Sequence, residues 1–177
     1  MRTFLLILLL CGSAIAQVPG SFAPTPPQAS LIESLVTRLN LSKEVAWTKF
    51  QQHLPVADLK REAAILTALK SQGEKIGLSS NEVSVLFVPQ IAASRRAQEE
   101  RIAAWRFGTP LPKTPPKDLQ RDIRPLVTKV SLEMLQEWKA LPAQSRSADF
   151  QEAAERRIIQ AGFSADVARI AASPLGK

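Results

Sequence analysis

The signals that start and stop helices constrain the fold of this chain more than any other feature of the sequence. Ser79 and Glu82 form a capping box, which predicts a helix that continues to about Arg106. Gly108 and Pro110 then end it. Similar signals delimit five further predicted helices, at about residues 29–53, 58–75, 117–140, 148–161 and from 164 onward. We therefore predict an all-α fold, with one helical domain of about six helices over residues 29–177.

The composition favours the same fold. The 177 residues include no tyrosine and only 7 glycines, and Ala, Leu, Arg, Gln and Glu, which favour helices, are frequent. Pro125 lies inside the predicted helix at 117–140, so we expect that helix to kink or to start late. Residues 117–177 are interpreted as a helical scaffold around five apolar side chains, Trp138, Phe150, Ile158, Ile159 and Phe163.

The first sixteen residues are typical of a signal peptide. Arg2 is followed by an apolar stretch at residues 4–10, and Ala14 and Ala16 form a small-x-small cleavage site. We expect cleavage after Ala16, which removes Cys11, the only cysteine, and export to the periplasm or the medium. No later run of about 20 apolar residues follows, so no stable membrane insertion is expected. Residues 17–28 are rich in proline and are predicted to be a disordered lead-in.

The formal net charge of +7 favours an anionic partner. The positive residues are scattered among acidic ones, and no nucleic-acid-binding motif is recognisable. A small anionic ligand therefore fits better than a nucleic acid, and we expect no nucleic-acid partner.

Polar side chains interrupt apolar helix faces at three places. Arg38 and Lys49 share one face of the first predicted helix, eleven residues or about 16 Å apart. Asp58 with Arg61 and Glu62 opens the second helix, where a helix cap and surface charges are the ordinary interpretation. Ser94 and Gln98 continue an apolar stripe of the third helix, where such residues are usually exposed.

Taken together, these seven residues resemble the active-site pattern of the all-helical AroQ-type chorismate mutases. The surrounding sequence is similar to the secreted (periplasmic) subclass, for instance in Arg38-Leu39 and in residues 54–56, Leu-Pro-Val, before Asp58. The resemblance covers about residues 30–107. It implies an active site within the helical bundle, no cofactor and no metal, and a homodimer. A further arginine completes the pocket in this family. Arg124 is our choice and Arg121 the alternative.

The resemblance also implies a role for each residue. Arg38, Arg61 and the distal arginine would bind the two carboxylates of the chorismate dianion, with Ser94 in support. Lys49 and Gln98 would donate hydrogen bonds to the ether oxygen, whose bond breaks as chorismate rearranges to prephenate. Glu62, with the Asp58 region, would accept a hydrogen bond from the ring hydroxyl. The catalytic set is Lys49, Gln98, Arg38 and Glu62.

A second reading of the same residues stays open. An exported helical module that binds anionic ligands or a protein partner without turnover would use the same cations. Simple carboxylate binding, however, does not require a Lys49 and Gln98 pair for an ether oxygen.

Overall fold

The computed structural model describes residues 22–176. The predicted signal peptide and residues 17–21 of the lead-in lie outside the described residues. Within 22–176 the regular structure is entirely helical, as predicted. The main helices are α1 (Pro26–Gln51), α2 (Leu59–Lys75), α3 (Ser80–Arg106), α4 (Arg124–Ala140), α5 (Ala148–Gln160) and α6 (Ala165–Ala172).

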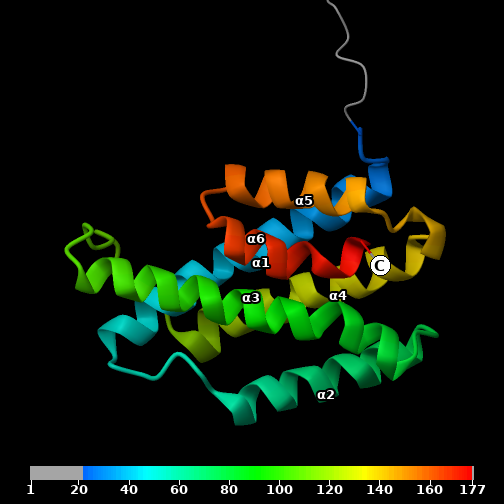
Figure 1. Ribbon diagram of the computed structural model, residues 1–177. Coiled ribbons are helices and arrows are strands. Elements are labelled where there is room, and N and C mark those ends of the chain that lie inside the picture. Colours follow the sequence, from blue (N-terminus) through cyan, green and yellow to red (C-terminus); the bar gives the residue numbers. More distant parts are fainter. Residues whose placement is uncertain (1–21, 177) are drawn as a thin grey trace, which may run out of the picture.

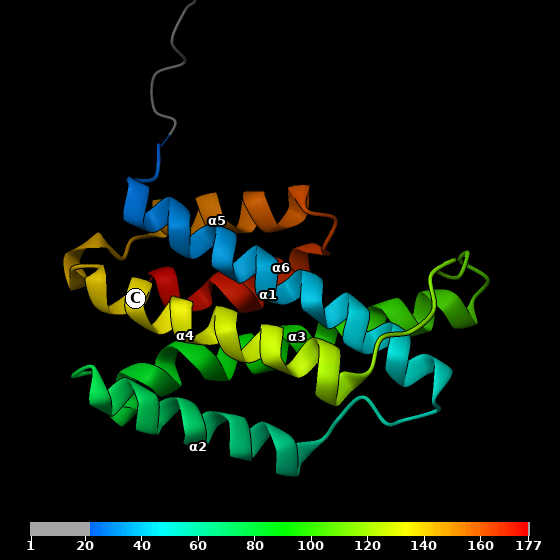
Figure 2. The same cartoon turned by 180° about the vertical axis from the view of Figure 1, so that it is seen from behind.

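The helices α1, α3 and α4 form the centre of the bundle (Figure 1). α2 packs against α3 and α4 at one edge, and α5 with α6 covers the opposite edge, an arrangement that is also visible from behind (Figure 2). In that view the extended segment after α3 runs back to the start of α4. α2 therefore lies on the opposite side of this centre from α5 and α6.

Most helix boundaries agree with the sequence signals. The capping box before α3 is present: the Ser79 N–H donates to the Glu82 carboxylate at 2.8 Å, and the Glu82 N–H donates to the Ser79 hydroxyl at 3.2 Å. Asp58 caps α2 by accepting the Arg61 N–H at 3.0 Å. Pro125 delays α4, which begins at Arg124 after one π-helical turn, Leu119–Ile123.

The start and the end of α1 differ from the prediction. The helix begins at Pro26, three residues before Ala29, so residues 26–28 are helical and not disordered. Proline is tolerated in a first turn because the N–H groups there have no helical partner. The Gln28 side chain accepts the Thr25 N–H at 2.9 Å and donates to the Ser145 carbonyl at 2.9 Å, which ties the start down. At the other end α1 stops at Gln51, and His53 adopts a left-handed φ of 54°.

Four of the five predicted scaffold side chains belong to the apolar core. Trp138, Phe150 and Ile158 are fully buried, and Phe163 is nearly so. Ile159 was predicted with them, but it is 46% exposed. Successive helical residues point about 100° apart, so the side chain after buried Ile158 faces solvent.

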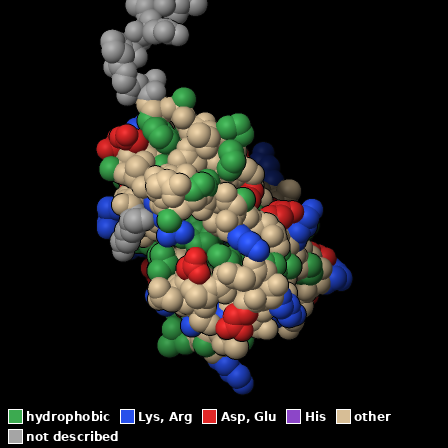
Figure 3. All heavy atoms as spheres, turned by 90° about the vertical axis from the view of Figure 1, so that its right-hand side faces the viewer, with side chains coloured by type: hydrophobic (Ala, Val, Ile, Leu, Met, Phe, Trp, Pro, Cys, Tyr) green, Lys and Arg blue, Asp and Glu red, His purple; other side chains and the backbone are tan. Residues whose placement is uncertain are grey.

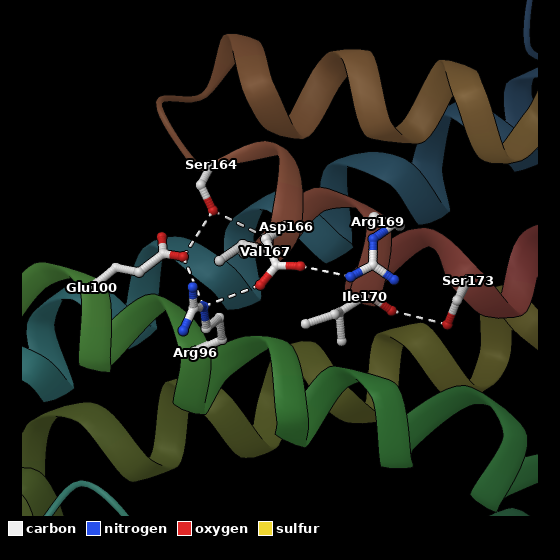
Figure 4. A network of polar contacts seen from close by, with 8 residues as sticks. All are labelled: Arg96, Glu100, Ser164, Asp166, Val167, Arg169, Ile170 and Ser173. Carbon is white, nitrogen blue, oxygen red and sulfur yellow. Dashed lines mark hydrogen bonds and ion pairs between the residues drawn. The ribbon is translucent and has the colours of Figure 1, made fainter.

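The outer face of α3 is tied to α6 by a polar network (Figure 4). Arg96 contacts Glu100 at 2.9 Å and Asp166 at 3.1 Å. The Ser164 hydroxyl donates to the Glu100 carboxylate at 3.0 Å and caps α6 by accepting the Val167 N–H. These contacts fix the face of α3 that points toward α6. Another face of α3 packs against α2.

Gly73 lets α2 approach α3 closely. A Cβ on Gly73 would overlap Cγ2 of Val83, which is stiff because its side chain is β-branched. We expect Gly73→Ala to lower the free energy of unfolding by about 1 kcal/mol or more, because overpacking outweighs the better helix propensity of alanine. Urea unfolding checks this. On a Val83→Ala background the same change should cost nothing; an equal loss on both backgrounds would contradict this account.

No described helix is both long and apolar enough to cross a bilayer. Lys, Arg, Asp and Glu side chains are interspersed over the face shown in Figure 3, where the basic ones do not gather in a single patch.

Candidate active site

A cavity of about 430 Å³ lies between α1, α2, α3 and α4. Its walls include all eight residues of the predicted site: Arg38, Lys49, Asp58, Arg61, Glu62, Ser94, Gln98 and Arg124. Arg121, the alternative to Arg124, does not line it. The Arg121 side chain is exposed and pairs with Asp122 at 2.9 Å. Residues far apart in the sequence therefore meet at one cavity, and of the two arginines it is Arg124 that lines it.

Arg38 is a buried cation in the wall of the cavity. Its side chain projects from α1 between α3 and α4, and the residue is only 4% exposed. Nη1 donates to the Gln90 carbonyl at 2.9 Å and to the Ser94 hydroxyl at 2.7 Å, and Nε lies 3.4 Å from the Ser131 hydroxyl. Burial lowers the pKa of Arg38 to about 10. Arg38 therefore stays charged at neutral pH.

No carboxylate within residues 22–176 pairs with Arg38. Its three acceptors are neutral oxygens, and it takes part in none of the ion pairs of the described chain. A buried charge without a counter-charge is costly. Such an arrangement is typical of a site whose ligand supplies the missing negative charge.

Lys49 lies farther along the same face of α1. Its ammonium donates to the Val56 carbonyl at 2.6 Å, in the loop that leads to α2. Burial lowers the pKa of Lys49 below its ordinary value. Asp58 and Glu62 act in the opposite direction, and Arg124 adds to the lowering. An ammonium has three hydrogens, so Lys49 keeps two for a ligand while it holds the loop.

The start of α2 contributes Arg61 and two carboxylates, which differ in the partners they already have. Asp58 is used as the helix cap. Glu62 pairs with Arg95 of α3 at 3.4 Å, with both side chains partly exposed. The Nε of Arg61 is buried and has no hydrogen-bond partner among the described residues. Arg61 therefore has a donor to spare beside the cavity.

Gln98 presents an amide to the cavity from α3. The residue is 8% exposed, and Nε2 donates to the Ser94 carbonyl one turn earlier at 3.0 Å. The second Nε2 hydrogen is left over, and Oε1 is buried without a partner within 22–176. Gln98 was predicted as a polar residue on an apolar stripe, and the structure turns that stripe toward the cavity.

Sequence reasoning missed several polar side chains that line the cavity, among them Arg95 and Ser131. Arg95 follows Ser94 directly and pairs with Glu62. Ser131 is buried on α4, beside Arg38. The spacing from Arg124 to Ser131 is seven residues, or two helical turns, so the two share a face of α4. That periodicity could have indicated Ser131 once Arg124 was chosen.

The cavity carries an excess of positive charge. Five cationic side chains line it, Arg38, Lys49, Arg61, Arg95 and Arg124, against two carboxylates, Asp58 and Glu62. Among the described residues, no three or more His, Cys, Asp or Glu side chains cluster so that they could hold a metal ion. The donors and charges are suited to a small ligand with more than one negative group.

The sequence model of one family, chorismate mutase type II, matches residues 29–99. That range carries seven of the eight predicted residues and both walls formed by α1 and α3. Over this part of the chain the protein is similar to the chorismate mutase type II family. Arg124 and Ser131 lie beyond the matched range, so α4 completes the cavity from outside it.

Individual chorismate mutases are similar to this chain. The secreted chorismate mutase of Yersinia pestis is 32% identical over 100 residues, 56% of this chain and 53% of that protein. The monofunctional chorismate mutase of Enterobacter agglomerans is 29% identical over 112 residues, 63% of this chain and 59% of that protein. The chain thus spans somewhat more than half the length of these curated relatives.

The fold is also that of a solved chorismate mutase. The crystal structure of the enzyme from Burkholderia thailandensis superimposes with a TM-score of 0.75 over 85% of this chain and 99% of that one, at 24% sequence identity. The superposition covers more of the chain than the family match, which ends at residue 99.

Proposed function

We propose that this protein is an exported chorismate mutase that converts chorismate to prephenate in the cavity between α1 and α4. The buried Arg38 guanidinium carries the proposal, because it faces the cavity and no carboxylate of the described residues pairs with it. Chorismate is a dianion, and its two carboxylates would supply the missing charge. The family of residues 29–99 and the names of the similar proteins support the same reaction.

The reaction is an intramolecular rearrangement in which a C–O bond breaks while a C–C bond forms. It needs a compact substrate conformer and stabilisation of negative charge on the ether oxygen. Arg38, Arg61 and Arg124 bind the carboxylates from three sides of the cavity, with Ser94 beside Arg38. Holding both carboxylates restricts the substrate to its reactive conformer.

Lys49 and Gln98 then stabilise the transition state. Each keeps hydrogens that residues 22–176 do not use, two on the Lys49 ammonium and one on the Gln98 amide. Their contact with the ether oxygen strengthens as negative charge develops there, which is the condition for a faster chemical step. Glu62, which pairs with Arg95, accepts a hydrogen bond from the ring hydroxyl of chorismate. Asp58 caps the start of α2 and so keeps Glu62 in place.

Chorismate turnover tests the proposal. The purified protein is mixed with chorismate, and the loss of chorismate absorbance is followed. Conversion of the product to phenylpyruvate by acid identifies it as prephenate. Formation of prephenate is the expected result. Tight chorismate binding without turnover would favour instead the non-catalytic anion-binding module.

The pH dependence tests the roles of Lys49 and Gln98. An amide needs no proton to donate, so we expect kcat/KM to be nearly constant from about pH 5 to 8. Burial lowers the pKa of Lys49, so the ammonium loses its proton before the pH reaches 10.5, the ordinary pKa of lysine. As the pH rises, activity should therefore begin to fall before that value is reached. A steep fall between pH 5 and 8 without unfolding would contradict the role of Gln98.

Gln98→Glu should make the enzyme acid-dependent. A carboxyl donates a hydrogen bond only while protonated, and its ordinary pKa is about 4.3, with burial acting to raise it. We expect kcat/KM of this variant to be at least about tenfold higher at pH 5 than at pH 8. Rate measurements at both values, with circular dichroism as a folding control, check the prediction. A flat profile in the variant would place Gln98 outside the reaction.

Export and assembly are further parts of the proposal. The N-terminal apolar segment and the secreted Yersinia pestis relative support export to the periplasm or the medium. A homodimer follows only from the family resemblance. Cell fractionation and sedimentation analysis of the purified protein test these two points separately.

A further inference from the structure

Ser131 of α4 lies against the Arg38 guanidinium inside the bundle. The residue is 2% exposed, and its hydroxyl donates to the Val127 carbonyl at 2.7 Å. A serine hydroxyl has one hydrogen and two lone pairs. Since that hydrogen is used, Ser131 can only accept from Arg38, and its oxygen lies 3.4 Å from Nε. In this contact Arg38 is therefore always the donor and Ser131 the acceptor.

The three contacts of Arg38 leave one part of the guanidinium for a ligand. Both Nη1 hydrogens are used, by the Gln90 carbonyl and the Ser94 hydroxyl of α3, and Nε is directed at Ser131. The two Nη2 hydrogens have no acceptor among residues 22–176. A guanidinium is planar and rigid, so contacts at Nε and Nη1 from two different helices determine where Nη2 points.

We infer that Ser131 is a positioning residue of the site, which orients the Arg38 guanidinium so that Nη2 meets a substrate carboxylate. The inference rests on the proposed function, and adds to it a residue that touches Arg38 and not the reacting atoms. Ser94 and Gln90 hold the guanidinium at Nη1 alone, and from α3 alone. Ser131 adds a contact at Nε from α4 and so reinforces the orientation from a second helix.

The removal of Ser131 should affect substrate binding more than the chemical step. In Ser131→Ala the Nε–H loses its acceptor, and the guanidinium turns away from the carboxylate. A hydrogen bond to a charged group corresponds to about tenfold or more in an equilibrium constant, so we expect kcat/KM to fall about tenfold, mostly through KM. Ser131→Thr keeps the oxygen and should stay within about threefold of the wild type.

Ser84→Ala is the matched control. Ser84 also sits inside a helix and donates to the carbonyl four residues earlier, Ser80, at 2.8 Å, but it does not line the cavity. It should leave kcat and KM unchanged. A general effect of removing a helical serine would appear in both alanine variants.

A second readout does not depend on turnover. The Arg38 Nε–H signal in a ¹⁵N–¹H spectrum of the purified protein is identified by its loss in Arg38→Lys. We expect it to exchange slowly with water in the wild type, at least about tenfold faster in Ser131→Ala, and slowly again in Ser131→Thr. An unchanged signal in Ser131→Ala would overturn the inference, whatever the rates. If the wild type turned over no chorismate, the proposed function would fail, and the signal would still decide whether Ser131 orients Arg38.

Discussion

Lys49→Ala is expected to lower kcat/KM for chorismate several hundredfold. Removing one donor that stabilises a developing oxyanion costs roughly 3–4 kcal/mol in other enzymes, and the Lys49 donor is also charged. The ammonium lies in the cavity wall and keeps two hydrogens beyond the one that holds Val56. Because its contact strengthens at the transition state, kcat should fall more than KM rises. Initial rates over a range of chorismate concentrations measure both.

Lys43→Ala is the control for Lys49. Lys43 lies on the same helix, and its ammonium also donates to a backbone carbonyl, that of Ala161 at 3.0 Å. It faces α5 and α6, and does not line the cavity. We expect kcat/KM within twofold of the wild type for Lys43→Ala. A loss of less than tenfold for Lys49→Ala would remove Lys49 from the reaction.

Arg38→Met should separate activity from stability. Without the buried cation the substrate carboxylate loses its partner, and truncating one member of a buried charge pair costs at least about 2–3 kcal/mol, or roughly 100-fold in kcat/KM. The free protein, however, contains no carboxylate that compensates Arg38 within the described residues. Replacing such a charge by an apolar side chain of similar length should leave the free energy of unfolding unchanged or raise it by about 1 kcal/mol.

Arg157→Met should show the opposite pattern. Arg157 donates to both oxygens of Glu33, at 2.7 and 2.8 Å, on the surface between α5 and α1. Its loss should lower the free energy of unfolding by up to about 1 kcal/mol and leave the rate unchanged. Urea unfolding and chorismate kinetics on both variants make the comparison. If Arg38→Met unfolded the protein and Arg157→Met did not, Arg38 would be structural.

Local signals predicted most of the fold. A cap needs only residues three apart, so Asp58 and Ser79 placed the starts of α2 and α3 correctly. The start of α1 was predicted late although its signal is local, because Thr25 and Gln28 form a capping box and Pro26 opens the helix. Only the contact of Gln28 with the Ser145 carbonyl joins residues that the sequence does not bring together.

The same distinction applies to the site. Arg38 and Lys49 share a helix face, so their common wall could be predicted from spacing alone. The choice between Arg124 and Arg121 depends on the path of the proline-rich segment and on a π-helical turn, which periodicity does not describe. Arg95 is recognised only through its contact with Glu62. Ser131 is recognised through its contact with Arg38, and its seven-residue spacing from Arg124 could indicate it only after Arg124 had been chosen.

The central claim is that this one cavity binds the transition state of the chorismate rearrangement. Calorimetric titration with a stable bicyclic ether dicarboxylate, which mimics that transition state, tests it most directly. We predict one site per chain in the wild type, at least about 100-fold weaker binding to Arg38→Met, and a comparable loss in Lys49→Ala. Equal affinity for all three proteins would contradict the account, because the dianion would then bind somewhere else.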